Sequence, residues 1–438
     1  MNREILRLAI PSIISNITVP LLSIADIAIM GHMGDAAYLA AISVGAMIFN
    51  VMYWVLGFLR MSTSGLTSQA LGRADADSIR RMFARSLANA LALGALLVLV
   101  SIPLRHAMLW AFQVGDGTRE IVTTYFNVCI FGAPAVLGGF ALNGWLIGMQ
   151  DTKTPMTVAI TQNVVNIALS LFFVYVLSMG VTGVALGTML SQWIAVAMLF
   201  LLARHRHGAY AVWRRSGAVA GQHSGKPFAT LNGQIFLRTV CLVAVNMYFT
   251  SAGSAQGVVT LSVNTLLMTF FTLFSYIMDG FAFAGEALGG KFYGAGDRKS
   301  LSGLHRRLLL WGAILVVAFT VAYALCGREL LALLTSDHTV IEAAQPYFRF
   351  VLLVPACGML AFVYDGLFIG MTRASAMLLS CFVGAAAFFA LYFSLFASLG
   401  NDALWYALLA YLLLRGLLLA VIFPRVCTFT NSRPSRYN

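Results

Sequence analysis

The sequence predicts an all-α polytopic membrane protein with twelve transmembrane helices in two six-helix lobes. Of its 438 residues, 60% are hydrophobic and only 10% are charged, and the mean hydropathy is +0.85. A soluble domain has about 45–50% apolar and about 25% charged residues, so this composition excludes an ordinary soluble enzyme. The apolar stretches are continuous, whereas the strands of a membrane β-barrel alternate residue by residue.

Twelve apolar windows follow one another along the chain, and each is long enough to cross a bilayer as a helix of about 20 residues. They are separated by polar or glycine-rich segments. The windows are 5–31, 37–68, 83–104, 121–148, 155–178, 181–203, 233–253, 257–289, 304–327, 345–370, 376–398 and 403–424.

The longest polar segment lies between the sixth and seventh windows and divides the chain into two halves. We predict an N-terminal lobe (1–203), a cytoplasmic linker (204–232), a C-terminal lobe (233–424) and a cytoplasmic tail (425–438).

The net charge of +12 comes from Lys and Arg residues in short loops, where it indicates topology rather than nucleic-acid binding. Most of these cations fall on the side of the termini and the linker, so the positive-inside rule places that side in the cytoplasm. We expect a multi-pass protein of the cytoplasmic (inner) membrane that acts as a monomer. Its partners are the lipid bilayer and small organic substrates, with no nucleic acid. The six cysteines have no paired spacing and predict no metal site.

Short segments recur at an offset near 220 residues, which predicts a tandem duplication of a six-helix unit. Six helices per copy relate the halves by an axis along the membrane normal, around a central cavity that opens alternately to each side. The recurring pairs are 143–149 with 365–371, 69–72 with 286–289, and 42–44 with 261–263.

Six ionisable residues inside apolar windows stand out as candidates, because an ionisable residue at membrane depth costs about 3 kcal/mol and usually marks a pathway or a paired site. They are Asp26, Arg60, Arg238, Asp279, Glu286 and Asp365. Asp26 has no basic neighbour in sequence, and a carboxylate in a low dielectric can bind a proton or Na⁺. The alternative for Asp26 is a carboxylate bonded to nearby hydroxyls for packing alone.

Pro11 and Pro20 precede Asp26 in the same helix. Each proline removes a backbone hydrogen bond and permits a bend, so protonation of Asp26 could be coupled to helix shape.

Neutral polar residues on the fifth and sixth helices could complete a network with Asp26. Asn166 and Ser170 share one helical face, and Thr188 lies on the next helix. Such residues can also bond only to their own backbone. Further candidates to line a substrate cavity are Asn50, Tyr53, Trp54, Asn143 and Asn163.

The acids of the second lobe have two interpretations each. Asp279 and Glu286 are seven residues apart on one helical face, and form either a cation or substrate site or ion pairs with Arg60 or Arg238. The repeat counterpart of Asp365 is uncharged Asn143, which indicates specialised copies. The alternative is an Asp bonded to a helix terminus.

No catalytic motif is present in the sequence. It contains no Walker loop, no His-Glu-x-x-His and no Gly-x-Ser-x-Gly. We therefore expect no enzymatic activity and no cofactor other than a coupling ion.

Three segments, 58–70, 278–287 and 364–374, resemble the DinF-type branch of the MATE (multidrug and toxic compound extrusion) family, and the resemblance covers the whole chain. It implies a cation-coupled antiporter that exports amphipathic, often cationic organic compounds. In that branch a first-helix Asp couples transport and a proline fifteen residues earlier is associated with helix bending. These match Asp26 and Pro11, and the polar partners match Asn166 and Thr188.

One departure from the family concerns the fifth helix, where related proteins often carry a second Asp and this chain has Ser170. This leaves H⁺ and Na⁺ open as the coupling ion. The alternative function is a lipid-linked precursor flippase, a distant relative that should concentrate cations in its cavity. Only Arg60 and Arg238 are candidates for that role here.

Overall fold

The structure is a computed structural model that describes residues 1–31, 36–208, 210, 225–335 and 337–426; at residues 19–31, 36, 37, 39 and 225–228 it describes the backbone alone. The secondary structure of these residues is helical, and none of them forms a strand. The all-α fold class is confirmed.

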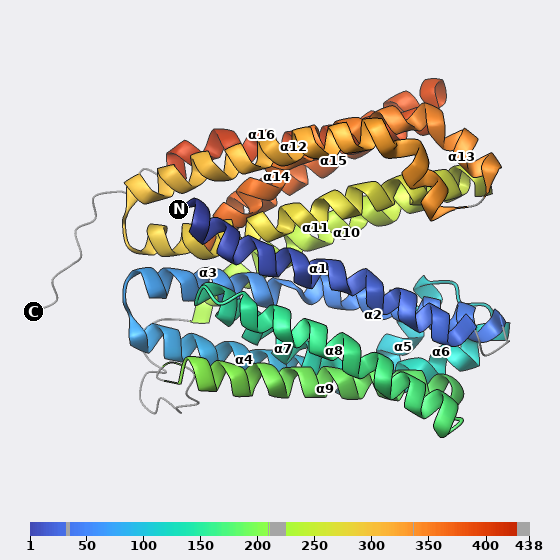
Figure 1. Cartoon of the computed structure of the whole chain (residues 1–438), viewed down its shortest axis with the longest axis horizontal. Coiled ribbons are helices and arrows are strands. Elements are labelled where there is room, and N and C mark those ends of the chain that lie inside the picture. Colours follow the sequence, from blue (N-terminus) through green and yellow to red (C-terminus); the bar gives the residue numbers. More distant parts are fainter. Residues whose placement is uncertain (32–35, 209, 211–224, 336, 427–438) are drawn as a thin grey trace, which may run out of the picture. The chain divides into compact units, whose positions relative to one another are not determined.

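The chain folds into two compact units (Figure 1). Residues 10–232 form the N-terminal lobe, and residues 233–438 together with 1–9 form the C-terminal lobe. The predicted linker, 204–232, includes helix at both ends, because α9 continues to Arg206 and α10 begins at Gly225. Residues 211–224 of that linker lie outside the described residues, as do tail residues 427–438.

Antiparallel helices build each lobe (Figure 1). The N-terminal lobe contains α1 (Asn2–Gly31) from residue 10 onward, α2 (Ala36–Leu56), α3 (Phe58–Gly72), α4 (Ala76–Leu99), α5 (Ser101–Ala111), α6 (Asp116–Cys129), the short η1 (Ile130–Gly132), α7 (Ala133–Gly148), α8 (Lys153–Leu171), the π-helical η2 (Phe172–Val176) and α9 (Gly180–Arg206). The C-terminal lobe contains α10 (Gly225–Ala255) from residue 233 onward, α11 (Val258–Gly294), α12 (Arg298–Leu334), α13 (His338–Ala344), η3 (Gln345–Tyr347), α14 (Phe348–Gly370), α15 (Ala374–Leu399) and α16 (Asn401–Val426).

Eleven helical stretches of the described chain are long and apolar enough to cross a membrane. The first predicted window, 5–31, is occupied by the 30-residue helix α1, and the twelve-helix fold is confirmed. Several windows hold two helices in series, such as α2 and α3, which break at Gly57. Helices α11 and α12 have 37 residues each, so at 1.5 Å per residue they are about 55 Å long and exceed the hydrocarbon core of about 30 Å.

Buried aromatic side chains fill the interior of each lobe. In the N-terminal lobe, the rings of Phe83 and Trp145 meet edge to face with centroids 5.0 Å apart. In the C-terminal lobe, Trp405 stacks on Phe350 at 5.9 Å and meets Phe249 edge to face at 5.2 Å. Such large rings bury much apolar area and pack in specific offset or edge-to-face arrangements, so they hold the helices of each lobe together.

The backbone turns repeat at a constant interval of 222 residues. Three left-handed positions recur with that spacing, namely Ala74 with Gly296, Gln150 with Thr372, and Ser178 with Gly400. The helix caps recur too, because Asp75 accepts from the Ser78 amide and Asp297 accepts from the Ser300 amide. The tandem duplication is therefore visible in the backbone as well as in short sequence strings.

Glycines in α7 and α14 set the same register in the two lobes. A Cβ atom at Gly144 would overlap the Arg60 carbonyl of α3, and one at Gly366 would overlap the Ala282 carbonyl of α11. One turn later, Gly148 packs on the Ser64 carbonyl and Gly370 on the Glu286 carbonyl. By this packing, the counterpart of Glu286 in the N-terminal lobe is Ser64. The recurring strings 69–72 and 286–289 had instead paired Glu286 with Gln69, which lies five positions after Ser64.

This close approach predicts a large effect of a single methyl group. We expect Gly144→Ala to lower the free energy of unfolding by about 2–3 kcal/mol, because the clash is with backbone that no rotamer change can relieve. Gly139→Ala in the same helix is the matched control, since the nearest atom to its new Cβ is 4.0 Å away. Thermal unfolding in detergent measures both variants, and equal midpoints would contradict the assigned packing.

Candidate functional site

A polar network joins α8 and α9 inside the N-terminal lobe. Asn166 is 1% exposed, and its Nδ2 donates to Thr188 Oγ1 at 3.2 Å and to Ser191 Oγ at 3.4 Å. Ser191 Oγ donates in turn to the Thr188 carbonyl at 2.8 Å. The structure therefore brings together Asn166 and Thr188, and it adds Ser191, which was not predicted from the sequence.

Two buried oxygens of this region are left without hydrogen-bond partners among the described residues. They are Asn166 Oδ1 and Ser170 Oγ, and both side chains are essentially inaccessible. Ser170 lies where α8 crosses Gly187 of α9, and a Cβ at that glycine would come within 2.6 Å of the Ser170 hydroxyl. An unsatisfied buried polar atom costs about 1–3 kcal/mol, so two of them on one helix face indicate a place for an ion, a proton donor or water.

Helix α8 is also bonded to α1. Asn163 Nδ2 donates to the Thr18 carbonyl at 3.0 Å. Asp26 lies eight residues further along α1, which is about 12 Å along the helix axis. The side chains of Asp26 and Pro20 lie outside the described residues, whereas Pro11 is buried.

The predicted cavity residues are spread over several environments. Asn50 and Trp54 are exposed on α2, which packs on α6 and α7, and the Tyr53 ring lies against Phe49 with centroids 5.6 Å apart. Asn143 Oδ1 is buried and has no partner among the described residues. A described cavity of about 370 Å³ lies elsewhere, at the turn between α5 and α6. A substrate-lining role for these residues stays a prediction.

Three charged residues meet inside the C-terminal lobe, and we refer to Arg238, Asp365 and Arg415 as the C-lobe charge cluster. Their side chains come from α10, α14 and α16 and are 4–8% exposed. Arg238 Nη2 donates to Asp365 Oδ2 at 2.5 Å, and Arg415 Nη2 donates to the same oxygen. Arg415 Nη1 also reaches the Tyr411 hydroxyl at 3.4 Å.

The cluster differs from the interpretations offered by the sequence. Arg238 forms its ion pair with Asp365, a residue that no sequence pattern had linked to it. Arg415 was not among the candidates, although a cation inside an apolar window was the signal that could have identified it. Of the remaining candidates, Glu286 is fully buried, and Asp279 and Arg60 are half-buried.

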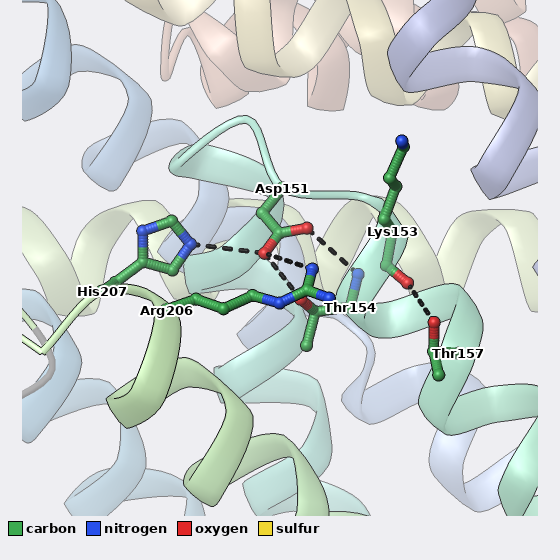
Figure 2. Close-up of polar contacts among 6 residues, drawn as sticks. All are labelled: Asp151, Lys153, Thr154, Thr157, Arg206 and His207. Carbon is green, nitrogen blue, oxygen red and sulfur yellow. Dashed lines mark hydrogen bonds and ion pairs between the residues drawn. The ribbon is translucent and has the colours of Figure 1, made fainter.

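A second polar cluster lies where α7, α8 and α9 end or begin (Figure 2). Asp151 accepts from the Thr154 amide at 3.0 Å and from its hydroxyl at 2.6 Å, as an N-terminal cap of α8. The same carboxylate lies 3.3 Å from His207 Nε2 and 3.7 Å from Arg206 Nη1. Burial raises the pKa of Asp151, but the hydrogen bonds from His207 and Thr154 and the charge of Arg206 outweigh it and lower the pKa to about 2.

This lowered pKa predicts an acid-sensitive contact. The folded state favours charged Asp151, so its contribution is present above the ordinary carboxyl value of 3.8 and is lost as the pH falls towards about 2. We expect Asp151→Ala to cost about 2 kcal/mol at neutral pH, and the difference from wild type to vanish as the pH falls through this window. Unfolding midpoints measured across that pH range test this. A difference that persists unchanged at the acid end would contradict it.

No group of three or more His, Cys, Asp or Glu side chains suited to a metal ion occurs within the described residues. The Asp151 cluster contains only one carboxylate and one imidazole beside a cation, and its geometry is that of a helix cap tied to the end of α9.

Comparison with known proteins decides the family. The MatE family profile matches residues 11–172 and 235–400, which fall in both lobes and make up most of the chain. This chain belongs to the MATE family. DNA damage-inducible protein F of Escherichia coli K12 is 35% identical to it over 424 residues, covering 97% of this chain and 92% of that protein. The resemblance to the DinF-type branch is thereby confirmed.

Other proteins and solved structures are also similar to this MATE-family protein. A probable multidrug resistance protein NorM of Thermotoga maritima is 23% identical over 79% of this chain and 75% of that protein. A crystal structure of a MATE protein in the bent conformation superposes with a TM-score of 0.88 at 18% identity, covering 97% of this chain and 95% of that one. A Pyrococcus furiosus MOP superfamily transporter, reported with a binding pocket of reverse polarity, gives 0.84 at 19% identity, covering 98% and 96%. The profile of the lipid II flippase MurJ matches residues 132–276.

These findings make the chain a multi-pass membrane transporter of the MATE family, consistent with the expected absence of enzymatic activity.

Proposed function

We propose that this MATE-family protein is a secondary active antiporter that exports amphipathic, often cationic organic compounds across the cytoplasmic membrane in exchange for H⁺, with Na⁺ as the alternative ion. The supporting observation is the pair of buried oxygens, Asn166 Oδ1 and Ser170 Oγ, on the helix that is bonded to α1. The name of the NorM relative, a probable multidrug resistance protein, supports the substrate class.

The direction of the helices supports a role for Asp26. Four membrane crossings separate the start of α1 from the start of α8, so the two helices run in the same direction. Asn163 of α8 contacts Thr18 of α1, and Asn166 and Ser170 lie three and seven residues beyond Asn163. Three and seven residues beyond Thr18 are residues 21 and 25 of α1, and residue 25 is next to Asp26 in sequence. The two oxygens and the carboxylate are thus expected at similar depth.

A carboxylate with two neutral oxygens is suited to one monovalent cation. A proton on Asp26 would be donated to Asn166 Oδ1, and Na⁺ would be held by all three oxygens. When the ion binds from outside, Asp26 is neutralised and a bound organic cation loses its counter-charge and leaves. Pro11 and Pro20 allow α1 to bend in the same step. Because Ser170 stands where relatives often have a second acid, we expect one ion at this site per cycle.

Alternating access requires that ion and substrate compete for Asp26 or for the conformations that it selects. By linkage, each then weakens the binding of the other by the same factor. We further propose that both termini and the segment between α9 and α10 face the cytoplasm, on the distribution of Lys and Arg.

The decisive experiment is dye efflux from proteoliposomes that contain the purified full chain, with a proton gradient and a sodium gradient imposed separately. Efflux driven by the proton gradient alone supports H⁺ exchange, and efflux driven by sodium alone moves the assignment to Na⁺. Efflux under neither gradient would contradict the proposal.

The match to the MurJ profile favours a lipid-linked precursor flippase as the second candidate. A parallel assay with a fluorescent polyprenyl pyrophosphate lipid, scored by its movement between leaflets, tests that function. Movement of the lipid without dye efflux would replace the antiporter proposal with the flippase.

A further inference from the structure

The C-lobe charge cluster is not balanced in charge. Arg238 and Arg415 each carry a guanidinium that stays protonated in proteins, and Asp365 supplies one carboxylate. Both guanidinium groups donate to one oxygen, Asp365 Oδ2. The three-residue cluster therefore holds one positive charge in excess, at side-chain exposures of 4–8%.

An excess charge in such a place is costly, because burial removes hydration that a single carboxylate cannot replace for two cations. Tyr411 reduces the cost without cancelling the charge. Its ring lies under Arg415, with the guanidinium carbon 5.5 Å from the ring centroid, and its hydroxyl lies 3.4 Å from Arg415 Nη1.

The hydrogen bonds of Arg415 leave its Nε without an acceptor among the described residues. Nη2 is bonded to Asp365 and Nη1 faces Tyr411. The Nε–Nη edge of Arg is the fork that pairs with the two oxygens of a carboxylate or phosphate. Here one donor of that fork, Nη2, is already bonded to Asp365, so Nε is the open position; Asp365 Oδ1 of the same cluster also has no hydrogen-bond partner among the described residues. A buried donor without an acceptor, next to an excess positive charge, indicates an oxyanion.

We propose that the C-lobe charge cluster binds a monovalent oxyanion of the carboxylate class, with Arg415 as the principal ligand. Arg238 adds a second positive charge at the same place, and Asp365 weakens anion binding because it competes for the same donors. The bound group could be a small free carboxylate or the carboxylate of a transported amphipathic compound. This site lies within the C-terminal lobe and is separate from the Asn166 network of the N-terminal lobe.

Binding can be measured without transport, by the thermal unfolding midpoint of the purified full chain in detergent. Acetate and a medium-chain carboxylate are titrated at constant ionic strength, with the matching amides as neutral controls. A ligand that binds only the folded state raises the midpoint with concentration. We expect carboxylates to raise it and amides to have no effect.

Variants of the cluster separate an anion site from a purely structural ion pair. Arg415→Gln leaves the balanced pair of Arg238 and Asp365, so the protein should fold, and its apparent affinity for carboxylate should fall by about tenfold or more. Asp365→Asn removes the competing carboxylate and should raise that affinity by a similar factor. Arg349→Gln is the matched control, since Arg349 pairs with Asp402 at 2.6 Å but is 57% exposed.

The possible results are distinct. A folded Arg415→Gln protein with the wild-type response to carboxylate would overturn the proposal, as would a wild-type midpoint that responds to amides and carboxylates alike. Equal affinity for acetate and the longer carboxylate assigns a free anion, and tighter binding of the longer one assigns a substrate group. Asp26→Asn should keep the full response, so failure of the antiporter proposal leaves this one standing.

Discussion

Asp26→Asn is expected to abolish ion-driven efflux while the protein remains folded in the membrane. Asn is nearly isosteric with Asp but can neither bind a proton at neutral pH nor offer a negative charge to Na⁺ or to an organic cation. Without a group that exchanges the ion, a gradient cannot drive export, so we expect the gradient-driven rate to fall to the level of empty liposomes. Efflux in proteoliposomes under the active gradient measures it.

Two companion variants show whether the rest of the network takes part. Ser170→Ala removes a buried hydroxyl without a partner among the described residues, so we expect weaker apparent ion affinity with little loss of stability. Ser86→Ala is the matched control, because the Ser86 hydroxyl is also buried but is bonded to the Met82 carbonyl of its own helix at 2.6 Å. Full ion-driven export by Asp26→Asn would refute the assigned coupling residue.

Asp365→Leu is expected to destabilise the protein more than either Gly144→Ala or Asp151→Ala. It replaces the carboxylate with an apolar side chain and leaves two buried guanidinium groups without their counter-charge. Removing one partner of a buried ion pair costs about 3–5 kcal/mol, and here the lost partner serves both cations. Unfolding in detergent, followed by tryptophan fluorescence, measures the loss.

Replacement of the whole cluster tests the same physics in the opposite direction. Combining Asp365→Leu with Arg238→Met and Arg415→Met should recover most of the lost stability, because apolar side chains of similar volume often replace a buried ionic group without cost. Arg349→Met, at the exposed pair with Asp402, should cost no more than about 1 kcal/mol. A single Asp365→Leu variant as stable as Arg349→Met would mean that the cluster is hydrated rather than buried.

The sequence alone determined the class of protein and the order of its helices. An apolar run of 20 or more residues must form a helix in a bilayer, because every backbone amide and carbonyl then finds its partner within the same segment. That rule is local, so windows such as 155–178 and 403–424 could be placed without tertiary information. The rule did not give the helix ends correctly. The third window was predicted to begin at residue 83, whereas α4 begins at Ala76, because Asp75 accepts a hydrogen bond from the Ser78 amide there.

Only the tertiary structure decided which polar side chains meet. Arg238 and Asp365 are 127 residues apart, and Arg415 is 50 residues beyond Asp365, so no local spacing links the three. The amide of Asn166 could face a neighbour or its own backbone, and its bond to Thr188 depends on how α8 crosses α9. Helix formation follows from the residues of one segment, whereas a polar contact depends on the register of two packed helices. Close contacts such as Gly144 on the Arg60 carbonyl set that register.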